Sequence, residues 1–137
     1  MNYEISYIAG FFDGEGYIQI KPAGGLSIRF HNTNRDVLEF IKKFMAEKLK
    51  IFDVKISEKK KYSDNHKTCL LIEVCGNKAK KVLECMLPYL IIKKDVSKLA
   101  IEYQNLQNKW RGSKPARIKR RMDEIKTKIR ELNKRGL

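Results

Sequence analysis

A hairpin followed by an amphipathic helix occurs twice in this chain, and the repeat limits its possible folds more than any other feature. In the first copy, residues 17–21 and 26–31 each alternate polar and apolar side chains, and residues 22–25 are typical of a turn between two strands. The apolar residues of the segment 37–49 then follow the spacing of a helix, with Asn34 in the place of an N-cap. The polar side chains of both strands are therefore predicted to share one face of a sheet.

The second copy of this pattern starts near Val54. A strand over residues 54–57, a polar loop around residues 59–66 and an apolar strand over residues 69–74 predict the second hairpin, and residues 79–90 predict its helix. The phase of the strand 69–74 is not fixed by its sequence, because it is nearly all apolar.

A helix over residues 3–13 precedes both copies. Its apolar positions 7, 8, 11 and 12 are expected to share one face, and the glycines at positions 14 and 16 are expected to end it by adopting positive φ. The predicted fold class is therefore α+β, with elements in the order αββαββα and a four-stranded antiparallel sheet.

Two further helices are predicted after Pro88. One fits the apolar residues from Val96 to Trp110, and the segment 111–115 breaks it. The last helix has a narrow apolar stripe, which is expected to pack on the surface of the domain rather than form a free coiled coil, because it covers too few heptads. We predict one domain over residues 1–110 and a basic helical extension over residues 111–137.

The charge of the chain favours a polyanionic partner. Lys and Arg number 30 against 16 Asp and Glu, which gives a net charge of +14; a highly charged soluble surface is the alternative explanation. No apolar run reaches the roughly 18 residues that span a membrane, and the N-terminus lacks the pattern of a secretion signal. An intracellular location is expected, in a prokaryotic cytoplasm or in an organelle whose genome encodes the chain. The three cysteines show no zinc-ligand spacing and are expected to be reduced.

The segment IAGFFDGEG, residues 8–16, combines small residues, aromatics and two acids separated by glycine. It resembles the motif that names the LAGLIDADG family of homing endonucleases and related intron maturases. The polar-faced hairpin, its repeat and the segment LPYLIIKK at residues 87–94 extend the resemblance over residues 5–110. The resemblance implies a LAGLIDADG endonuclease fold that binds DNA through the polar face of its sheet.

The resemblance also implies catalytic roles. Glu15 matches the family's metal-binding carboxylate, one methylene longer than the Asp of the motif, and together with Gly14 it is expected to hold Mg²⁺, with Mn²⁺ as a substitute. Ca²⁺ would support binding without efficient cleavage. Asn34 matches a polar residue that positions water, and Lys93 matches a basic residue near the scissile phosphate. The alternatives are a solvated turn residue for Glu15, a helix cap for Asn34, and a surface lysine for Lys93 with Lys94 in its role.

The single motif implies a homodimer, because one acid per chain is too few to cut two strands. Gly10 and Gly14 are four residues apart, as are Ala9 and Asp13, so one stripe of the first helix is small enough for a second copy to approach closely. Ala9, Gly10 and Asp13 are the predicted interface residues, with the two phenylalanines of the motif turned to the core. Ordinary packing within the chain is the alternative for Gly10.

The predicted readers of base edges lie on the polar face of the sheet. They are Gln19, Lys21, Ser27, Arg29 and His31 in the first hairpin and Lys55, Ser57, Lys59 and Glu73 in the second. Lys60, Lys61, Lys67 and the basic residues of the last helix are expected to contact phosphates instead. The predicted function is a homodimeric, Mg²⁺-dependent endonuclease that cuts both strands of DNA at a long, roughly palindromic site. An intron RNA maturase, a cleavage-inactive DNA-binding protein of the same fold and a general RNA-binding protein are the alternatives.

Overall fold

The computed structural model describes residues 3–59 and 68–136. Its elements are α1 (Tyr3–Glu15), β1 (Gly16–Ile20), β2 (Leu26–Asn32), α2 (Arg35–Leu49), β3 (Ile56–Lys59), β4 (Cys69–Cys75), α3 (Gly76–Met86), η1 (Leu87–Tyr89), α4 (Lys94–Lys109) and α5 (Ala116–Lys134). The predicted α+β class and the αββαββα order are confirmed. Lys60, Lys61 and Lys67 lie outside the described residues.

The four strands form one antiparallel sheet in the order β1-β2-β4-β3. Tyr17 on β1 pairs with Arg29 on β2, and Arg29 pairs in turn with Glu73 on β4. Strands β2 and β4 are therefore central, and β1 and β3 are the edges. Strand β3 starts two residues later than predicted, and Val54 is instead buried in the segment that leads to it.

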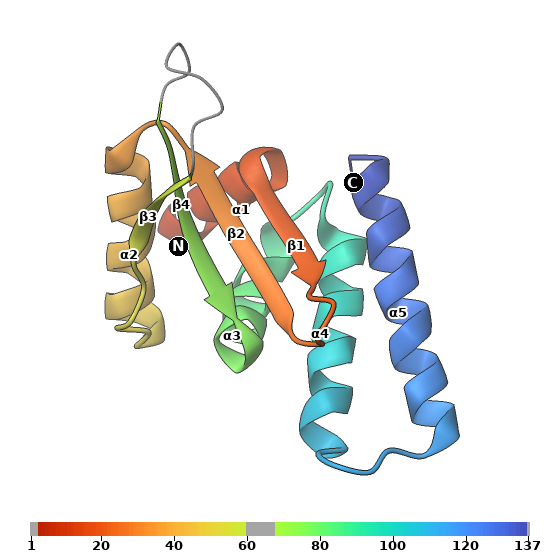
Figure 1. The fold of residues 1–137 in the computed structure, drawn as a ribbon. Helices are drawn as coiled ribbons and strands as arrows, with labels where there is room; N and C mark the ends of the chain where they lie inside the picture. Colours follow the sequence, from red (N-terminus) through yellow and green to blue (C-terminus); the bar gives the residue numbers. More distant parts are fainter. Residues whose placement is uncertain (1–2, 60–67, 137) are drawn as a thin grey trace.

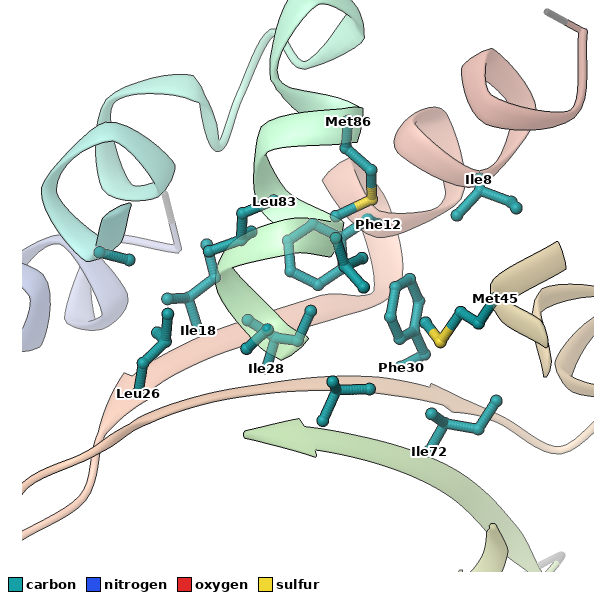
Figure 2. Packing of buried hydrophobic residues seen from close by; sticks show 14 of the residues in the cluster. Ile8, Phe12, Ile18, Leu26, Ile28, Phe30, Met45, Ile72, Leu83 and Met86 are labelled. Atoms are coloured by element: carbon teal, nitrogen blue, oxygen red, sulfur yellow. The ribbon is translucent and has the colours of Figure 1, made fainter. Parts of the chain in front are cut away.

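One face of the sheet is covered by helices, and no described helix lies over the other face (Figure 1). Alternate strand residues such as Ile18, Ile28 and Phe30 are buried on the covered face, as predicted from their alternation. Phe12 of α1 contacts Phe30 in this core, with ring centroids 5.0 Å apart (Figure 2). Strand β4 buries Leu70, Ile72 and Val74 in the same core, which fixes the phase that its sequence left open and turns Glu73 to the uncovered face.

Helix α1 departs from the prediction in its buried face and in its end. Its buried residues are Ile5, Ile8, Ala9 and Phe12. This spacing of three and four is the helical repeat, and it leaves Tyr7 56% exposed. The helix continues through Gly14, and neither Gly14 nor Gly16 has a positive φ, so the predicted ending is wrong. Gly16 instead opens β1, where an added Cβ would overlap the ring of Phe12.

Helix α5 packs against α4 and along the outer edge of β1 (Figure 1). Its stripe is buried at Ile118, Met122, Ile125 and Ile129, which confirms that it packs on the chain's own surface. The Arg121 guanidinium donates to both carboxylate oxygens of Glu102 on α4, at 2.6 and 2.7 Å. The Asn133 side-chain amide donates to the carbonyl oxygen of Ile18 on β1, at 2.8 Å. Within residues 3–59 and 68–136, no helix is both long enough and apolar enough to cross a membrane.

Candidate functional site

Asp13 joins the C-terminal end of α1 to the segment before α4. Its two carboxylate oxygens accept hydrogen bonds from the backbone N–H groups of Ile91, at 2.8 Å, and Lys93, at 3.0 Å. Its carbonyl oxygen accepts a further bond from Nζ of Lys93 at 2.6 Å. These bonds place Lys93 beside the motif, although about 80 residues separate the two in the sequence.

Lys93 is a buried lysine, with 9% of its surface exposed. Burial lowers the pKa of its ammonium group, while the nearby charges of Asp13 and Glu15 act in the opposite direction. The alternative of an ordinary surface lysine is therefore wrong for this position. A cation held at a fixed point and partly shielded from water is well placed to act on a nearby negative charge.

Glu15 ends α1 with its side chain exposed. Its charge acts on Lys93 and on His31, yet no hydrogen bond or ion pair to another described residue engages its carboxylate. The carbonyl groups in the last turn of a helix, such as that of Gly14, also lack partners within the helix. These oxygens have the chemistry that hard divalent cations prefer. In the described ranges, no three acidic, His or Cys side chains gather as a metal cluster, so one chain offers a single free carboxylate here.

Asn34 caps α2, which is the alternative role that the sequence offers for this residue. Its side-chain oxygen accepts the backbone N–H of Val37 at 3.3 Å, and its own N–H bonds to the side-chain oxygen of Asn32 at 2.8 Å. Because Phe30 pairs with Gly16 across β1 and β2, the chain reaches Asn34 at the same end of the sheet as Glu15. The cap uses only the amide oxygen, which leaves the NH₂ group with no bond to a described residue.

Glu73 lies in the middle of the uncovered face and is surrounded by donors. Its Oε2 accepts hydrogen bonds from Oγ of Ser27 and from Nε of Arg29, both at 2.9 Å, and its Oε1 is 3.7 Å from Nζ of Lys21. Burial acts to raise the pKa of Glu73, but the hydrogen bonds from Ser27 and Arg29 and the charges of Arg29 and Lys21 outweigh it, so the pKa lies below its ordinary value. The carboxylate is thus ionised at neutral pH.

The other predicted readers differ in exposure. Gln19, Lys21, Arg29 and His31 are partly exposed on the uncovered face, and Ser57 and Lys59 are exposed on β3. Lys55 is exposed but precedes β3. Ser27 is completely buried and donates its hydroxyl to Glu73, so the prediction that it contacts bases is wrong. The alternation of the strand correctly places Ser27 on the uncovered face, but a side chain this short is covered by its neighbours.

His31 stands between the polar face and the end of α1. Burial lowers the pKa of its imidazole, the charges of Lys59 and Arg29 lower it further, and the charge of Glu15 opposes them. Its buried Nε2 finds no hydrogen-bond partner among the described residues. The ring is therefore predominantly neutral at pH 7, with a donor or acceptor still to be satisfied.

The face of α1 opposite the core carries a stripe of exposed residues. They are Tyr3, Tyr7, Gly10 and Gly14. A Cβ added at Gly10 or Gly14 would come within 4 Å of no described atom outside the helix backbone. Ala9 is completely buried in the core, so the prediction that it lies in an interface is wrong. The Asp13 carboxylate, also predicted there, is turned to Ile91 and Lys93 of its own chain.

Residues 2–85 match the family model described as a LAGLIDADG-like domain. The chain belongs to the LAGLIDADG family. This match confirms the family that residues 8–16 indicated, and the motif occurs once in the sequence. A comparison with curated proteins finds no relative for the chain.

Solved structures of LAGLIDADG homing endonucleases share the fold. The archaeal intron-encoded enzyme I-Vdi141I, complexed with DNA, superposes with a TM-score of 0.74 and 18% identity over 96% of this chain and 84% of that chain. The structure of I-CvuI with its target and 2 mM Ca has a TM-score of 0.69 and 18% identity, over 94% of this chain and 81% of that chain. The structure of I-CvuI with the I-CreI target and 2 mM Mg, in which the DNA is not cleaved, has a TM-score of 0.69 and 19% identity. The match covers 96% of this chain and 85% of that chain. At these identities the likeness shows a common architecture.

Proposed function

We propose that this protein is a site-specific, metal-dependent DNA endonuclease that acts as a homodimer. The observation that carries the proposal is the free carboxylate of Glu15, beside the buried ammonium of Lys93 and at the end of an uncovered polar sheet face. The family and the three DNA-bound structures of the same architecture support it. A protein that only bound DNA would have no need for a free acid beside a positioned lysine.

Each residue of the candidate site would have a distinct task at a phosphodiester. A divalent cation bound here would stabilise charge on the phosphoryl group and activate a water. Glu15 and the carbonyl of Gly14 would hold it as oxygen ligands, which favours Mg²⁺, with Mn²⁺ as a substitute and Ca²⁺ as a cation for binding without efficient cleavage. Lys93, fixed by Asp13, would stabilise negative charge that develops on the phosphate. Asn34 would orient a water with its free NH₂ group while its oxygen caps α2.

The homodimer follows from the single free carboxylate per chain. Two strands need two such sites, and a twofold axis at the exposed stripe of α1 would bring two Glu15 side chains close together. The open space at Gly10 and Gly14 suits close approach of a second helix. Ile91 and Ile92, 85% and 50% exposed, add apolar surface beside this stripe, and clustered exposed apolar residues are typical of interaction sites.

The uncovered sheet face is proposed to enter the major groove, where base edges show a distinct donor and acceptor pattern. Helix α5 extends this face at the edge strand β1. Lys126 and Arg130 of α5 line a groove of about 150 Å³ together with Tyr17 and Gln19 of β1. These two cations are proposed to contact phosphates, which would fix the position of the duplex without reading its sequence.

Replacing Glu15 by Gln tests the function. The probe is a duplex that the wild-type protein enriches from a randomised pool, and the assay follows cleavage and retention with Mg²⁺ or Ca²⁺. Glu15→Gln should lose nearly all Mg²⁺-dependent cleavage and keep its binding, because the amide preserves the shape but not the charge. Glu131→Gln, at an exposed acid of α5, is the matched control and should cut normally.

Three outcomes would contradict parts of the proposal. A Glu15→Gln protein that cuts at near wild-type rate would remove Glu15 from catalysis. A wild-type protein that binds the duplex but does not cut it in the presence of any divalent cation would be a cleavage-inactive DNA-binding protein. A clear preference for structured intron RNA over duplex DNA would make it a maturase.

A further inference from the structure

We propose that Glu73 does not read a base itself but positions Arg29, so that the free end of the Arg29 guanidinium reads a guanine. The inference rests on the proposed function of the sheet as a DNA-binding surface. It assigns to two neighbouring residues, both predicted as readers, different tasks at one base position.

The Arg29 guanidinium is held by its inner edge. Arg29 and Glu73 are register partners on the two central strands, and the bond runs from Nε to Oε2 at 2.9 Å. Nε is the donor nearest the backbone, so this bond leaves both terminal NH₂ groups of the planar fork. In the described part of the chain, no other acceptor binds Arg29, and its side chain is 35% exposed. Two parallel donors on one arginine match the O6 and N7 acceptors of guanine.

The Glu73 carboxylate is also held by Ser27 and Lys21 of its own chain. Ser27 has no exposed surface, and its hydroxyl donates to the same Oε2 that binds Arg29. Lys21 approaches the other carboxylate oxygen at 3.7 Å. The acceptors that Glu73 would need to read the amino group of a cytosine are therefore directed to groups of its own chain. A carboxylate surrounded by three donors also offers less repulsion to an approaching polyanion.

This arrangement restricts Arg29 before DNA arrives. A free arginine has many rotamers, which it must lose when it forms two bonds to one base edge. The hydrogen bonds that Ser27 and Arg29 donate to Glu73 already restrict the rotamers of Arg29 in the free protein, so less conformational entropy is lost on binding. The alternative is a cross-strand ion pair that only stabilises the sheet, and this alternative predicts no effect confined to one base position.

The test is selection of duplexes from a randomised pool by the full-length protein and its variants. The variants are Arg29→Ala, Glu73→Ala, Glu73→Gln and, as a control at an exposed acid of β3, Glu58→Ala. Wild type should enrich guanine at one position of each half-site, and Arg29→Ala should lose that preference. Glu73→Ala should reduce it about tenfold at the same position and leave the other positions unchanged. Glu73→Gln should retain most of it, because its amide oxygen still accepts from Nε of Arg29.

Several results would overturn the inference. Unchanged guanine preference in Glu73→Ala would remove the positioning role, and a changed preference at a different position would make Glu73 a direct reader. Equal losses on all sequences, or a Glu73→Gln protein that behaves like Glu73→Ala, would leave only a structural or charge effect. A wild-type protein that enriches no sequence would instead refute the proposed DNA-reading function, and the inference with it.

Discussion

Asp13 and Lys93 bind each other in both directions. The Asp13 carboxylate accepts the backbone N–H of Lys93 at 3.0 Å, and the Lys93 ammonium donates to the Asp13 carbonyl oxygen at 2.6 Å. Each residue therefore fixes the main chain of the other. The first acid of the motif serves this connection, and the second acid, Glu15, is left free of it.

Removing the Asp13 carboxylate should destabilise the protein and displace Lys93. Asp13→Ala leaves the N–H groups of Ile91 and Lys93 without their acceptor, which should cost about 1–3 kcal/mol of unfolding free energy. Asp13→Asn keeps one acceptor oxygen and should cost less. Urea unfolding measures both, with Glu131→Gln as control. An Asp13→Ala protein of wild-type stability would show that the hydrogen bonds of the Asp13 carboxylate do not stabilise the fold.

Gly16 and Gly14 should respond differently to an added methyl group. At Gly16 the new Cβ would overlap the buried ring of Phe12, whereas at Gly14 it would meet no described atom within 4 Å beyond its chain neighbours and the backbone of its own helix. We expect Gly16→Ala to lower the free energy of unfolding by about 1–3 kcal/mol or more. Gly14→Ala should be less destabilising than Gly16→Ala, because the methyl group has room within its own chain and alanine favours the helix by up to about 1 kcal/mol. Thermal unfolding of the two variants side by side checks this, and equal stabilities would refute it.

Gly10→Leu should separate the proposed dimer without unfolding the chain. The position is exposed and open within one chain, so a leucine there fits the monomer but would keep two helices apart. Sedimentation should show dimers for wild type and monomers for Gly10→Leu, with the same circular dichroism for both. Asn105→Leu, at an exposed position of α4, is the control for added apolar surface. A Gly10→Leu protein that still sediments as a dimer would place the interface elsewhere.

Arg130 and Lys128 lie on different sides of α5, so their variants compare two surfaces of this helix. Arg130 lies beside Tyr17 and Gln19 at the sheet, whereas Lys128 lies with Arg120, Glu124 and Glu131 on another side of the helix. Arg130→Gln should weaken binding to all duplexes alike and reduce the slope of log affinity against log salt by about 1. Lys128→Gln should change the slope less. Equal slopes for both variants would exclude a specific phosphate contact by Arg130.

The attachment of α5 to α4 should weaken in acid. The hydrogen bond from Arg121 lowers the pKa of Glu102 below its ordinary value near 4.5. A carboxyl with a lowered pKa in the folded state stabilises the protein above its unfolded pKa, and this contribution is lost as the pH falls through the folded value. Glu102→Gln should therefore be less stable than wild type at pH 7, by less than about 1 kcal/mol because both partners are partly exposed. Urea unfolding at pH 7, 5 and 3 should show the difference shrink below the ordinary pKa of the carboxyl; a constant difference would contradict the assignment.

The regular parts of the fold could be predicted from periodicity. Alternation in β1 and β2 separates Ile18 and Ile28 from Gln19 and Arg29, because each strand has one polar face. Strand β4 gives no such signal: Leu70, Leu71 and Ile72 are all apolar, and only pairing with β2 decides which of them face the core. The apolar run in α1 has the same ambiguity, since both Tyr7 and Ile5 could belong to a buried stripe.

The candidate site was predictable in its residue types but not in its partners. The family resemblance implies catalytic roles for Glu15 and Lys93, yet nothing local in the sequence shows that Asp13 binds the N–H groups of residues 91 and 93. Ser27 looked like a reader because it alternates correctly, and its burial depends on how far neighbouring strands cover it. The bond between Arg29 and Glu73 depends on strand register, which only the tertiary structure sets.

The bond from Asn133 to the carbonyl of Ile18 has a consequence for solubility. An edge strand with free backbone groups is a template for strands of other chains, and uncovered edges promote aggregation. Helix α5 occupies this position on β1, and the side-chain amide of Asn133 takes the donor role that a neighbouring strand would otherwise fill. The opposite edge, β3, is short and carries the charged side chains of Glu58 and Lys59. A protein without α5 should therefore pair edge to edge and precipitate, even where its sheet and its motif remain folded.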